Sequence, residues 1–222
     1  LELVISKASE LLEQAGSSLE NAVKAEVFIS DPNDFKLMDK VWKKHFPNPP
    51  ARFVLPRSGM NHSKAKIEVS FMALTNDARL KKQSIETSDA PEPFGHEPQA
   101  IQVGQLLFFS TQMAFDSSGN IAEGTVRNAA APWYGRPAQS QMRYMMSNIN
   151  SIAEKAGSSV ENIVRRACFH NDLQWFAESI EEWARYFPSD KPASTTIGLN
   201  DSMVLDGANT LLDLIAFVPS ED

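Results

Sequence analysis

The sequence predicts an α/β fold, of the α+β kind, that contains two copies of one repeat. The main observation is that "EQAGSSLENAVKAEVFISDPNDF" (13–35) recurs as "EKAGSSVENIVRRACFHNDLQWF" (154–176). Gly16 pairs with Gly157 at an offset of 141 residues, and this offset holds throughout the match. The second observation is that helix-like and strand-like hydrophobic patterns alternate in the same order in each copy. A constant offset with a shared pattern indicates a duplicated structural unit.

The first copy opens with a predicted helix, whose apolar residues recur at helical spacing and which closes on Gly16, a natural helix stop. A strand follows, because "VKAEVFI" alternates as a half-buried strand does. The next helix carries Phe35, Met38 and Trp42 on one face, and "AKIEVSFMAL" reads as a final strand. These elements are expected at 3–16, 23–29, 34–46 and 65–74. Each repeat therefore ends helix–strand–helix–strand.

The second copy follows the same plan and adds a front end. Its corresponding elements are expected at 145–157, 164–170, 175–187 and 209–218. The stretch "AIQVGQLLFFSTQMAFDSSGNIAEG" precedes them and reads as a strand, a turn at Gly104, a second strand and a loop. Subtracting the offset from Met142 gives Leu1. The chain is therefore expected to begin near the top of the first copy's first helix, without that copy's N-terminal strands.

Three segments are expected along the chain. Residues 1–77 form the C-terminal part of the first domain, and residues 99–222 form a complete second domain. The stretch between them, 78–98, is polar and carries three prolines. Such a composition is typical of a linker.

The composition is that of an ordinary globular protein of 222 residues. A formal net charge of −7 disfavours nucleic acid as a partner, because proteins that bind it usually present a basic surface to the phosphate backbone. The single cysteine, Cys168, excludes an intramolecular disulfide and suits a reducing cytosol. No apolar run approaches the length of a membrane span, and no signal-peptide pattern is present. We expect a cytoplasmic protein without a membrane partner.

No metal or cofactor motif is present in the sequence. The four histidines lack ligand spacing such as H-E-x-x-H, and His170 sits on a predicted strand as a satisfied polar group. Cys168 lies in the apolar stretch "RACFH" and reads as a buried structural thiol. We therefore expect neither a metal nor an organic cofactor.

The ordered set of motifs in both copies resembles the Rid family, also called the YjgF-like or reactive-imine deaminase family. The first copy shows "AGSSLENAVKAEVFISDPNDF", "PPAR" and "KIEVSFMAL", and the second shows "LLFFSTQ", "EKAG", "FHNDLQWF" and "KPAS". The resemblance implies a mixed β-sheet with two helices packed on one face in each repeat. It also implies trimers with ligand clefts between protomers. The implied reaction is hydrolysis of enamine or imine intermediates, such as 2-aminoacrylate, to a keto acid and ammonia without a cofactor.

The resemblance implies two site residues in the first copy. Arg52 matches the family's arginine in "PAR", which holds the substrate carboxylate, and an arginine fork suits that role. Without the match, Arg52 reads most simply as a surface charge. Glu68 matches the glutamate of the last strand, which positions the attacking water. The alternative for Glu68 is an exposed strand glutamate.

The second copy departs from the family pattern at both places. Ser194 and Leu211 stand at the positions of the arginine and the glutamate, so this copy lacks both functions. It keeps Ser110, which matches a serine that lines the family's pocket, while Glu97 stands near the place of a tyrosine. Neither copy alone supplies a complete set of the family's catalytic residues.

Two interpretations of the duplication remain open. In the first, the repeats form a composite cleft, with Arg52 and Glu68 from the first copy and loop groups from the second. The insertion "RNAAAPWYGRPAQSQ" would then wall the cleft through Trp133, Tyr134 and Arg136, although a surface loop with buried aromatics is the simpler interpretation. In the second, the second copy is structural and substitutes for a protomer in a pseudo-trimeric ring.

Two functions follow as hypotheses. The first is a Rid-like protein that binds small carboxylates and hydrolyses an imine or enamine metabolite at Arg52. The alternative is a catalytically inactive ligand-binding or assembly module, as in the tail of a larger enzyme. Endoribonuclease action, which is attached to the family by name, is disfavoured by the negative charge. Self-association in a trimer-like or pseudo-trimeric form is expected, because a partial repeat leaves a sheet edge that needs covering.

Overall fold

The computed structural model describes residues 1–62, 64–131, 134–199 and 201–220, and two β-sheets are present in these ranges. The strand orders are β2-β1-β3 in the smaller sheet and β4-β5-β6-β9-β7-β8 in the larger. The helices are α1 (Glu2–Gln14), α2 (Phe35–His45), α3 (Pro137–Lys155) and α4 (Phe176–Trp183). The strands are β1 (Ala22–Ile29), β2 (Ala51–Pro56), β3 (Ile67–Ala73), β4 (Lys82–Ile85), β5 (Ala100–Val103), β6 (Leu106–Phe109), β7 (Ile163–His170), β8 (Ala193–Gly198) and β9 (Thr210–Phe217).

The two repeats share one topology, which confirms the predicted duplication and the α+β fold class. In each, a central strand, β1 or β7, pairs in parallel with β2 or β8 and in antiparallel with β3 or β9. Even the irregularities coincide, because the register shift between Ala22 and Lys24 recurs between Ile163 and Arg165. Gly16 and Gly157 both follow the first helix with φ values of 72° and 76°. Glycine adopts this left-handed conformation without strain.

The short 3-10 turn that leads into the second helix of each repeat begins from a similar cap. Asp31 accepts a hydrogen bond from the backbone N–H of Asn33 at 2.9 Å, and Asp172 accepts one from that of Gln174 at 2.8 Å. Each aspartate thereby satisfies a donor that the first turn would leave free. The apolar face of α2 predicted from the sequence is buried, as expected.

A further strand of each repeat, β2 or β8, lies between its second helix and its last strand, and the apolar run 53–55 that follows Arg52 indicates β2. The structure differs from the expected pattern between the repeats. The segment 78–98, expected to be a linker, is not irregular throughout, because β4 lies within it and pairs with β5 as the edge strand of the larger sheet. Only Ile85 of β4 is buried. One apolar residue among polar ones is too weak a pattern to indicate a strand.

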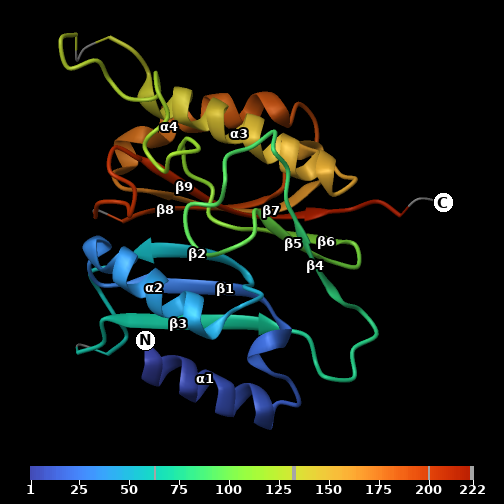
Figure 1. Ribbon diagram of the computed structural model, residues 1–222. Helices are drawn as coiled ribbons and strands as arrows, with labels where there is room; N and C mark the ends of the chain where they lie inside the picture. Colours follow the sequence, from blue (N-terminus) through green and yellow to red (C-terminus); the bar gives the residue numbers. More distant parts are fainter. Residues whose placement is uncertain (63, 132–133, 200, 221–222) are drawn as a thin grey trace.

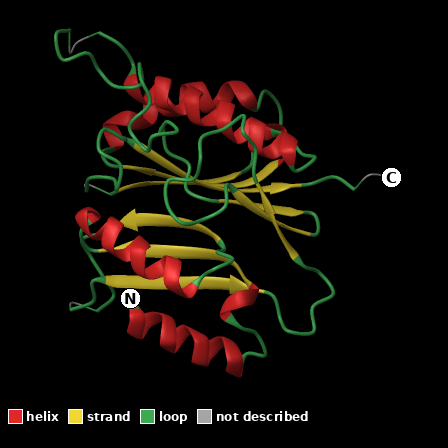
Figure 2. Cartoon of the chain, in the orientation of Figure 1, coloured by secondary structure: helices red, strands yellow, loops and turns green. Residues whose placement is uncertain are grey.

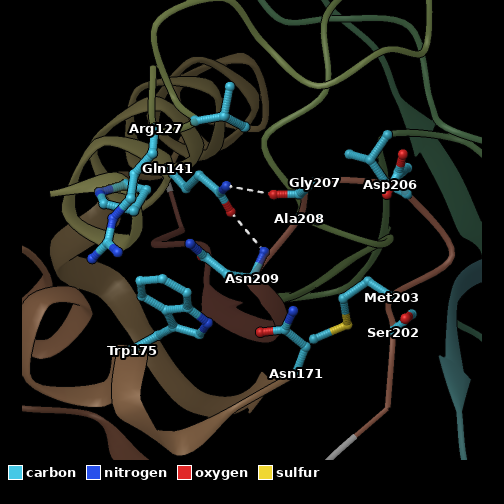
Figure 3. A pocket seen from close by; sticks show the side chains of 13 residues that line it. Arg127, Gln141, Asn171, Trp175, Ser202, Met203, Asp206, Gly207, Ala208 and Asn209 are labelled. Carbon is cyan, nitrogen blue, oxygen red and sulfur yellow. Dashed lines mark hydrogen bonds between the residues drawn. The ribbon is translucent and has the colours of Figure 1, made fainter. Parts of the chain in front are cut away.

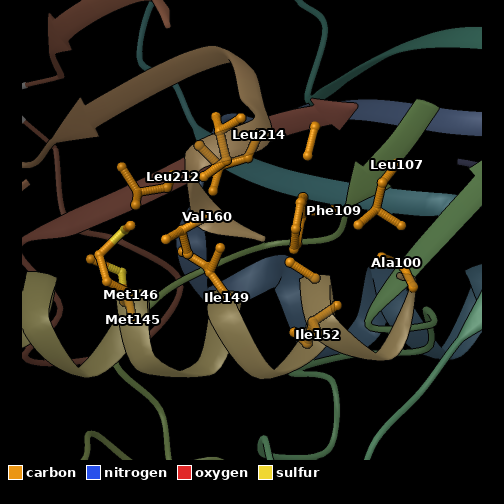
Figure 4. Packing of buried hydrophobic residues seen from close by; sticks show 14 of the residues in the cluster. Ala100, Leu107, Phe109, Met145, Met146, Ile149, Ile152, Val160, Leu212 and Leu214 are labelled. Carbon is orange, nitrogen blue, oxygen red and sulfur yellow. The ribbon is translucent and has the colours of Figure 1, made fainter. Parts of the chain in front are cut away.

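Helices cover one face of each sheet, and the two repeats meet through apolar side chains. Figure 1 shows the smaller sheet stacked beside the larger one, with β2 nearest to it and with α3 and α4 beyond the larger sheet. Residues of α3 such as Ile149 and Ile152 pack near Leu212 and Leu214 of β9 (Figure 4). A separate cluster joins Phe53 and Leu55 of β2 to residues of β7 and β9. The junction of the repeats is therefore part of the hydrophobic core.

No helix in the described ranges is both long and apolar enough to cross a bilayer (Figure 2). The longest is α3. One of its faces is buried against the larger sheet, and residues elsewhere on it are exposed. This is the pattern of a helix that packs on a sheet.

Candidate functional site

Arg52 lies at the junction of the two repeats, and its side chain is 0% exposed. Residues alternate along β2, so that Phe53 and Leu55 face the second repeat while Val54 packs with the helices of the first. Arg52 shares the helix-facing side, and its guanidinium lies 4.9 Å from the centroid of the Trp42 ring. The interpretation of Arg52 as a surface charge is therefore wrong.

Two carboxylates pair with the Arg52 guanidinium. Its Nε donates to Glu97 Oε2 at 2.6 Å, and its Nη2 donates to Asp39 Oδ1 at 2.5 Å. The Glu97 side chain, from the second repeat, is 2% exposed, and that of Asp39, on α2, is 23% exposed. Burial raises the pKa of the Glu97 carboxyl, an effect that the neighbouring Arg52 opposes. The anion that Arg52 was expected to take from a ligand comes here from the protein itself.

The segment 95–97 closes over this guanidinium. A Cβ atom at Gly95 would overlap Arg52 Nη2, so that glycine allows the close approach and a larger residue would displace the guanidinium. The backbone N–H of His96 donates to Asp39 Oδ1 at 3.0 Å, and His96 Nε2 donates to the carbonyl oxygen of Phe46 at 2.8 Å. The front of the second repeat is thereby bound to α2 of the first.

Ser110 also lies at the junction. Its Oγ accepts a hydrogen bond from the backbone N–H of Arg52 at 3.2 Å, and the N–H of Thr111 donates to the Arg52 carbonyl oxygen at 2.8 Å. The residues that follow β6 therefore pair with both backbone hydrogen-bonding groups of Arg52, on the open edge of β2. Arg52, Glu97 and Ser110 are brought together from both repeats, in the manner of the composite interpretation.

Glu68 lies apart from this cluster. On β3, Ile67 and Val69 pack with the helices of the first repeat, so Glu68 projects from the opposite face to Arg52. In addition, β1 separates β2 from β3. The Glu68 carboxylate accepts the backbone N–H of Asn61 at 2.6 Å and lies 3.6 Å from Arg57 Nη1. The four residues named from the sequence do not form one site.

The described residues of the insertion before α3 take no part in the cluster either. Trp133 lies outside the described residues. Tyr134 is 72% exposed, so it is neither a buried aromatic nor a pocket wall at Arg52. Arg136 pairs instead with Glu181 of α4 at 2.5 Å.

The second repeat places an arginine over the corresponding tryptophan, but from a different strand. Ser194 occupies the position of Arg52, and Arg166 of β7 lies 4.7 Å from the centroid of Trp183, the counterpart of Trp42. Arg166 Nη1 donates to Ser194 Oγ at 2.8 Å. Its Nε and Nη2 are buried without a partner among the described residues. Sequence reasoning missed this exchange, although "VRRACFH" shows an extra arginine where "VKAEVFI" has alanine.

A second buried ion pair crosses the junction. Lys24 Nζ of β1 lies 2.6 Å from Asp213 Oδ1 of β9, and it also donates to the carbonyl oxygen of Phe109. Arg165 Nη1 lies 2.6 Å from the other oxygen, Asp213 Oδ2. Burial acts to raise the pKa of Asp213, but Lys24 and Arg165 together hold it below its ordinary value. The sequence pattern of a half-buried strand gave no sign that Lys24 is on a covered face.

Cys168 and His170 are neighbours on β7, and both are buried. Burial raises the pKa of the Cys168 thiol to about 11 and lowers that of His170 to about 4, so that neither is charged at neutral pH. His170 is satisfied by Thr210 Oγ1 at 3.0 Å and Ser179 Oγ at 3.2 Å. Within the described ranges, no three His, Cys, Asp or Glu side chains are grouped to hold a metal ion.

Comparisons of sequence place the chain among known proteins. The profile of the family described as Endoribonuclease L-PSP matches residues 1–75 and 87–204. A RutC family protein of Pyrococcus horikoshii is 32% identical over 117 residues, which are 52% of this chain and 83% of that protein. Protein DfrA of Myxococcus xanthus is 28% identical over 141 residues, which are 62% of this chain and 97% of that protein.

Solved structures show the same relationship in three dimensions. RidA from an Antarctic Psychrobacter species matches with a TM-score of 0.51 and 25% identity, over 61% of this chain and 99% of that chain. Escherichia coli TdcF with bound serine matches with a TM-score of 0.50 and 25% identity, over 62% of this chain and 99% of that chain. One such protein therefore corresponds to only part of this chain, which agrees with a duplication.

Proposed function

Because this chain belongs to the Endoribonuclease L-PSP family, which includes Rid-type proteins, we propose that it is a catalytically inactive Rid-type module for ligand binding or assembly. The observation that carries the proposal is the pairing of Arg52 with Glu97 and Asp39. The remaining guanidinium nitrogen, Nη1, lies 3.7 Å from the sulfur of Met38. Nε and Nη2 are each already paired with a carboxylate of the protein, so a substrate carboxylate has to displace Glu97 or Asp39 to form two charge-assisted hydrogen bonds with them.

The position of Glu68 supports the same proposal. Imine hydrolysis requires a water molecule held beside the carbon that it attacks. A carboxylate on the other face of the sheet does not hold a water at Arg52. Ser110 accepts a hydrogen bond from the Arg52 backbone, and Glu68 accepts one from the Asn61 backbone. These two groups, which the family uses at one site, therefore bind different parts of the protein itself.

The assembly role is supported by what these contacts join. Glu97 and Ser110 come from the second repeat, while Arg52 and Asp39 come from the first. The pair between Lys24 and Asp213 crosses the same junction. The charged side chain of Arg52, which would bind a ligand in a catalytic site, instead joins the two repeats and holds them in one orientation.

An imine hydrolysis assay tests this proposal. The purified protein is expected not to accelerate release of keto acid and ammonia from 2-aminoacrylate generated by a serine dehydratase, with a single-domain Rid deaminase as the positive control. Acceleration that is lost in Glu68→Gln would overturn the proposal, because this change leaves the Arg52 ion pairs intact.

A deaminase that uses Arg52 is the second candidate. The convergence of Arg52, Glu97 and Ser110 from two repeats favours it, as does the bound serine in the related TdcF structure. In this case a small carboxylate replaces Glu97 on the guanidinium. The same assay distinguishes the two candidates, because the deaminase predicts acceleration by the unmodified chain.

Self-association is a further part of the proposal. β3 pairs with β1 on one side, and no other described strand pairs with it. Met72 of β3 is 42% exposed. An open edge of this kind favours pairing with a second copy. Light scattering over a range of concentrations is expected to find a species larger than the monomer, and a monomer at the highest concentration would contradict this.

A cytoplasmic location and the absence of nucleic acid and cofactor partners also stay predictions.

A further inference from the structure

A pocket of about 340 Å³ lies in the second repeat and shares no residue with the Arg52 cluster. It is formed by the loop that contains Arg127, the start of α3, the turn after β7 and the loop between β8 and β9 (Figure 3). Pockets that hold small molecules have volumes of roughly 300–1,000 Å³. This one is of a size that suits a small metabolite.

The pocket is held open by hydrogen bonds that already exist. Gln141, on α3, is 1% exposed. Its Nε2 donates to the Gly207 carbonyl oxygen at 2.9 Å, and its Oε1 accepts the backbone N–H of Asn209 at 2.9 Å (Figure 3). These bonds fix the loop before β9 to the helix. A ligand therefore meets a formed pocket, which lowers the entropy lost on binding.

Opposite charges stand on the two sides of the pocket. Figure 3 shows Arg127 and Trp175 on one side and Asp206 on the other. The Arg127 guanidinium lies 5.2 Å from the centroid of the Trp175 ring. Neither Arg127 nor Asp206 belongs to an ion pair with another described residue. A ligand that carries both a negative and a positive group complements this arrangement.

Between the two charges, the pocket offers one unpaired polar atom and an apolar wall. Asn171 Oδ1 is buried without a hydrogen-bond partner among the described residues. A buried acceptor in this state favours a ligand that brings an N–H donor. Met203 and Leu205, which are 4% and 5% exposed, line the same pocket and suit an apolar group.

We propose that this pocket binds an α-amino acid with an apolar side chain, as the zwitterion. Arg127 binds the carboxylate, for which its planar fork is suited. The ammonium group donates to Asn171 Oδ1, while the side chain packs against Met203 and Leu205. The inference does not depend on the proposed function, because the two sites have no residue in common.

Isothermal titration calorimetry with three matched probes tests the proposal. L-leucine carries both charged groups, 4-methylpentanoate lacks the ammonium group, and 3-methylbutylamine lacks the carboxylate. L-leucine is expected to bind at least tenfold more tightly than either analogue, since 4-methylpentanoate cannot donate to Asn171 Oδ1 and 3-methylbutylamine cannot pair with Arg127. Absence of L-leucine binding at millimolar concentration, or equal binding of 4-methylpentanoate, would overturn it.

Variants locate the binding within the chain. Arg127→Gln and Asn171→Leu are each expected to weaken L-leucine binding at least tenfold. Arg79→Gln removes the same charge from an exposed position between β3 and β4 and is expected to change the affinity less than twofold. Binding that Arg127→Gln leaves unchanged contradicts the proposal, and so does binding that is lost in Arg52→Lys. Because Arg127 is exposed, its variant is expected to fold as the wild type does.

Discussion

Replacing Arg52 with methionine is expected to lower the free energy of unfolding by about 3–5 kcal/mol, the usual effect of breaking a buried ion pair by removing one partner. The variant leaves the Glu97 carboxylate, which is 2% exposed, and the Asp39 carboxylate close together without a cation. Methionine retains most of the aliphatic volume beside Trp42, so the change isolates the charge. Urea denaturation followed by tryptophan fluorescence measures the loss.

Arg57→Met is the matched control, because it removes an arginine just beyond the other end of β2. The Arg57 side chain is 40% exposed and lies 3.6 Å from Glu68, so its loss is expected to lower the free energy of unfolding by less than about 1 kcal/mol. Equal losses in the two variants would contradict the structural role of Arg52. The comparison also bears on function, since residues retained for ligand binding often leave stability unchanged, or raise it, when replaced.

Replacing Lys24 with methionine is expected to lower the free energy of unfolding by about 3 kcal/mol, near the lower limit for a buried pair because Arg165 still neutralises part of Asp213. The effect should depend on pH. In the wild type, the lowered pKa of Asp213 gives a stabilisation that is present above its ordinary value of 3.8 and is lost as the pH falls below it. In the variant, burial favours the protonated carboxyl, so the loss should be greatest at neutral pH and smaller at pH 4. Unfolding curves at the two pH values measure this difference.

A double variant tests whether the loss comes from the unpaired charge. Lys24→Met combined with Asp213→Leu replaces the buried pair with apolar side chains, and such replacements are often neutral or stabilising. The double variant is therefore expected to recover most of the stability lost in Lys24→Met. If it is less stable than the single variant, the apolar packing at the junction, and not the charge pair, decides the stability.

The candidate site was predictable in part. The motif around Arg52, the presence of Ser110 and the exchange of a tyrosine for Glu97 were all readable in the sequence. The position of Asp39 was also readable in the sequence. It follows Phe35 by four residues, so it lies beside the buried face of α2. The pocket of Arg127 and Asn171 gave no such signal in the sequence, since its residues come from four segments that no repeat or motif connects.

The sequence by itself determined the duplication, the order of most elements and the family. These features rest on local periodicity and on a constant offset, both of which a single chain displays directly. Only the tertiary structure decided what the charged residues do. Arg52 meets Glu97, which is 45 positions further along the chain, and Lys24 meets Asp213 of the other repeat, because the two sheets dock there. Docking of the sheets brings together residues whose spacing in the sequence follows no helix or strand period. A charge that is buried in this way must be paired, and here its partner is another charged side chain of the same protein.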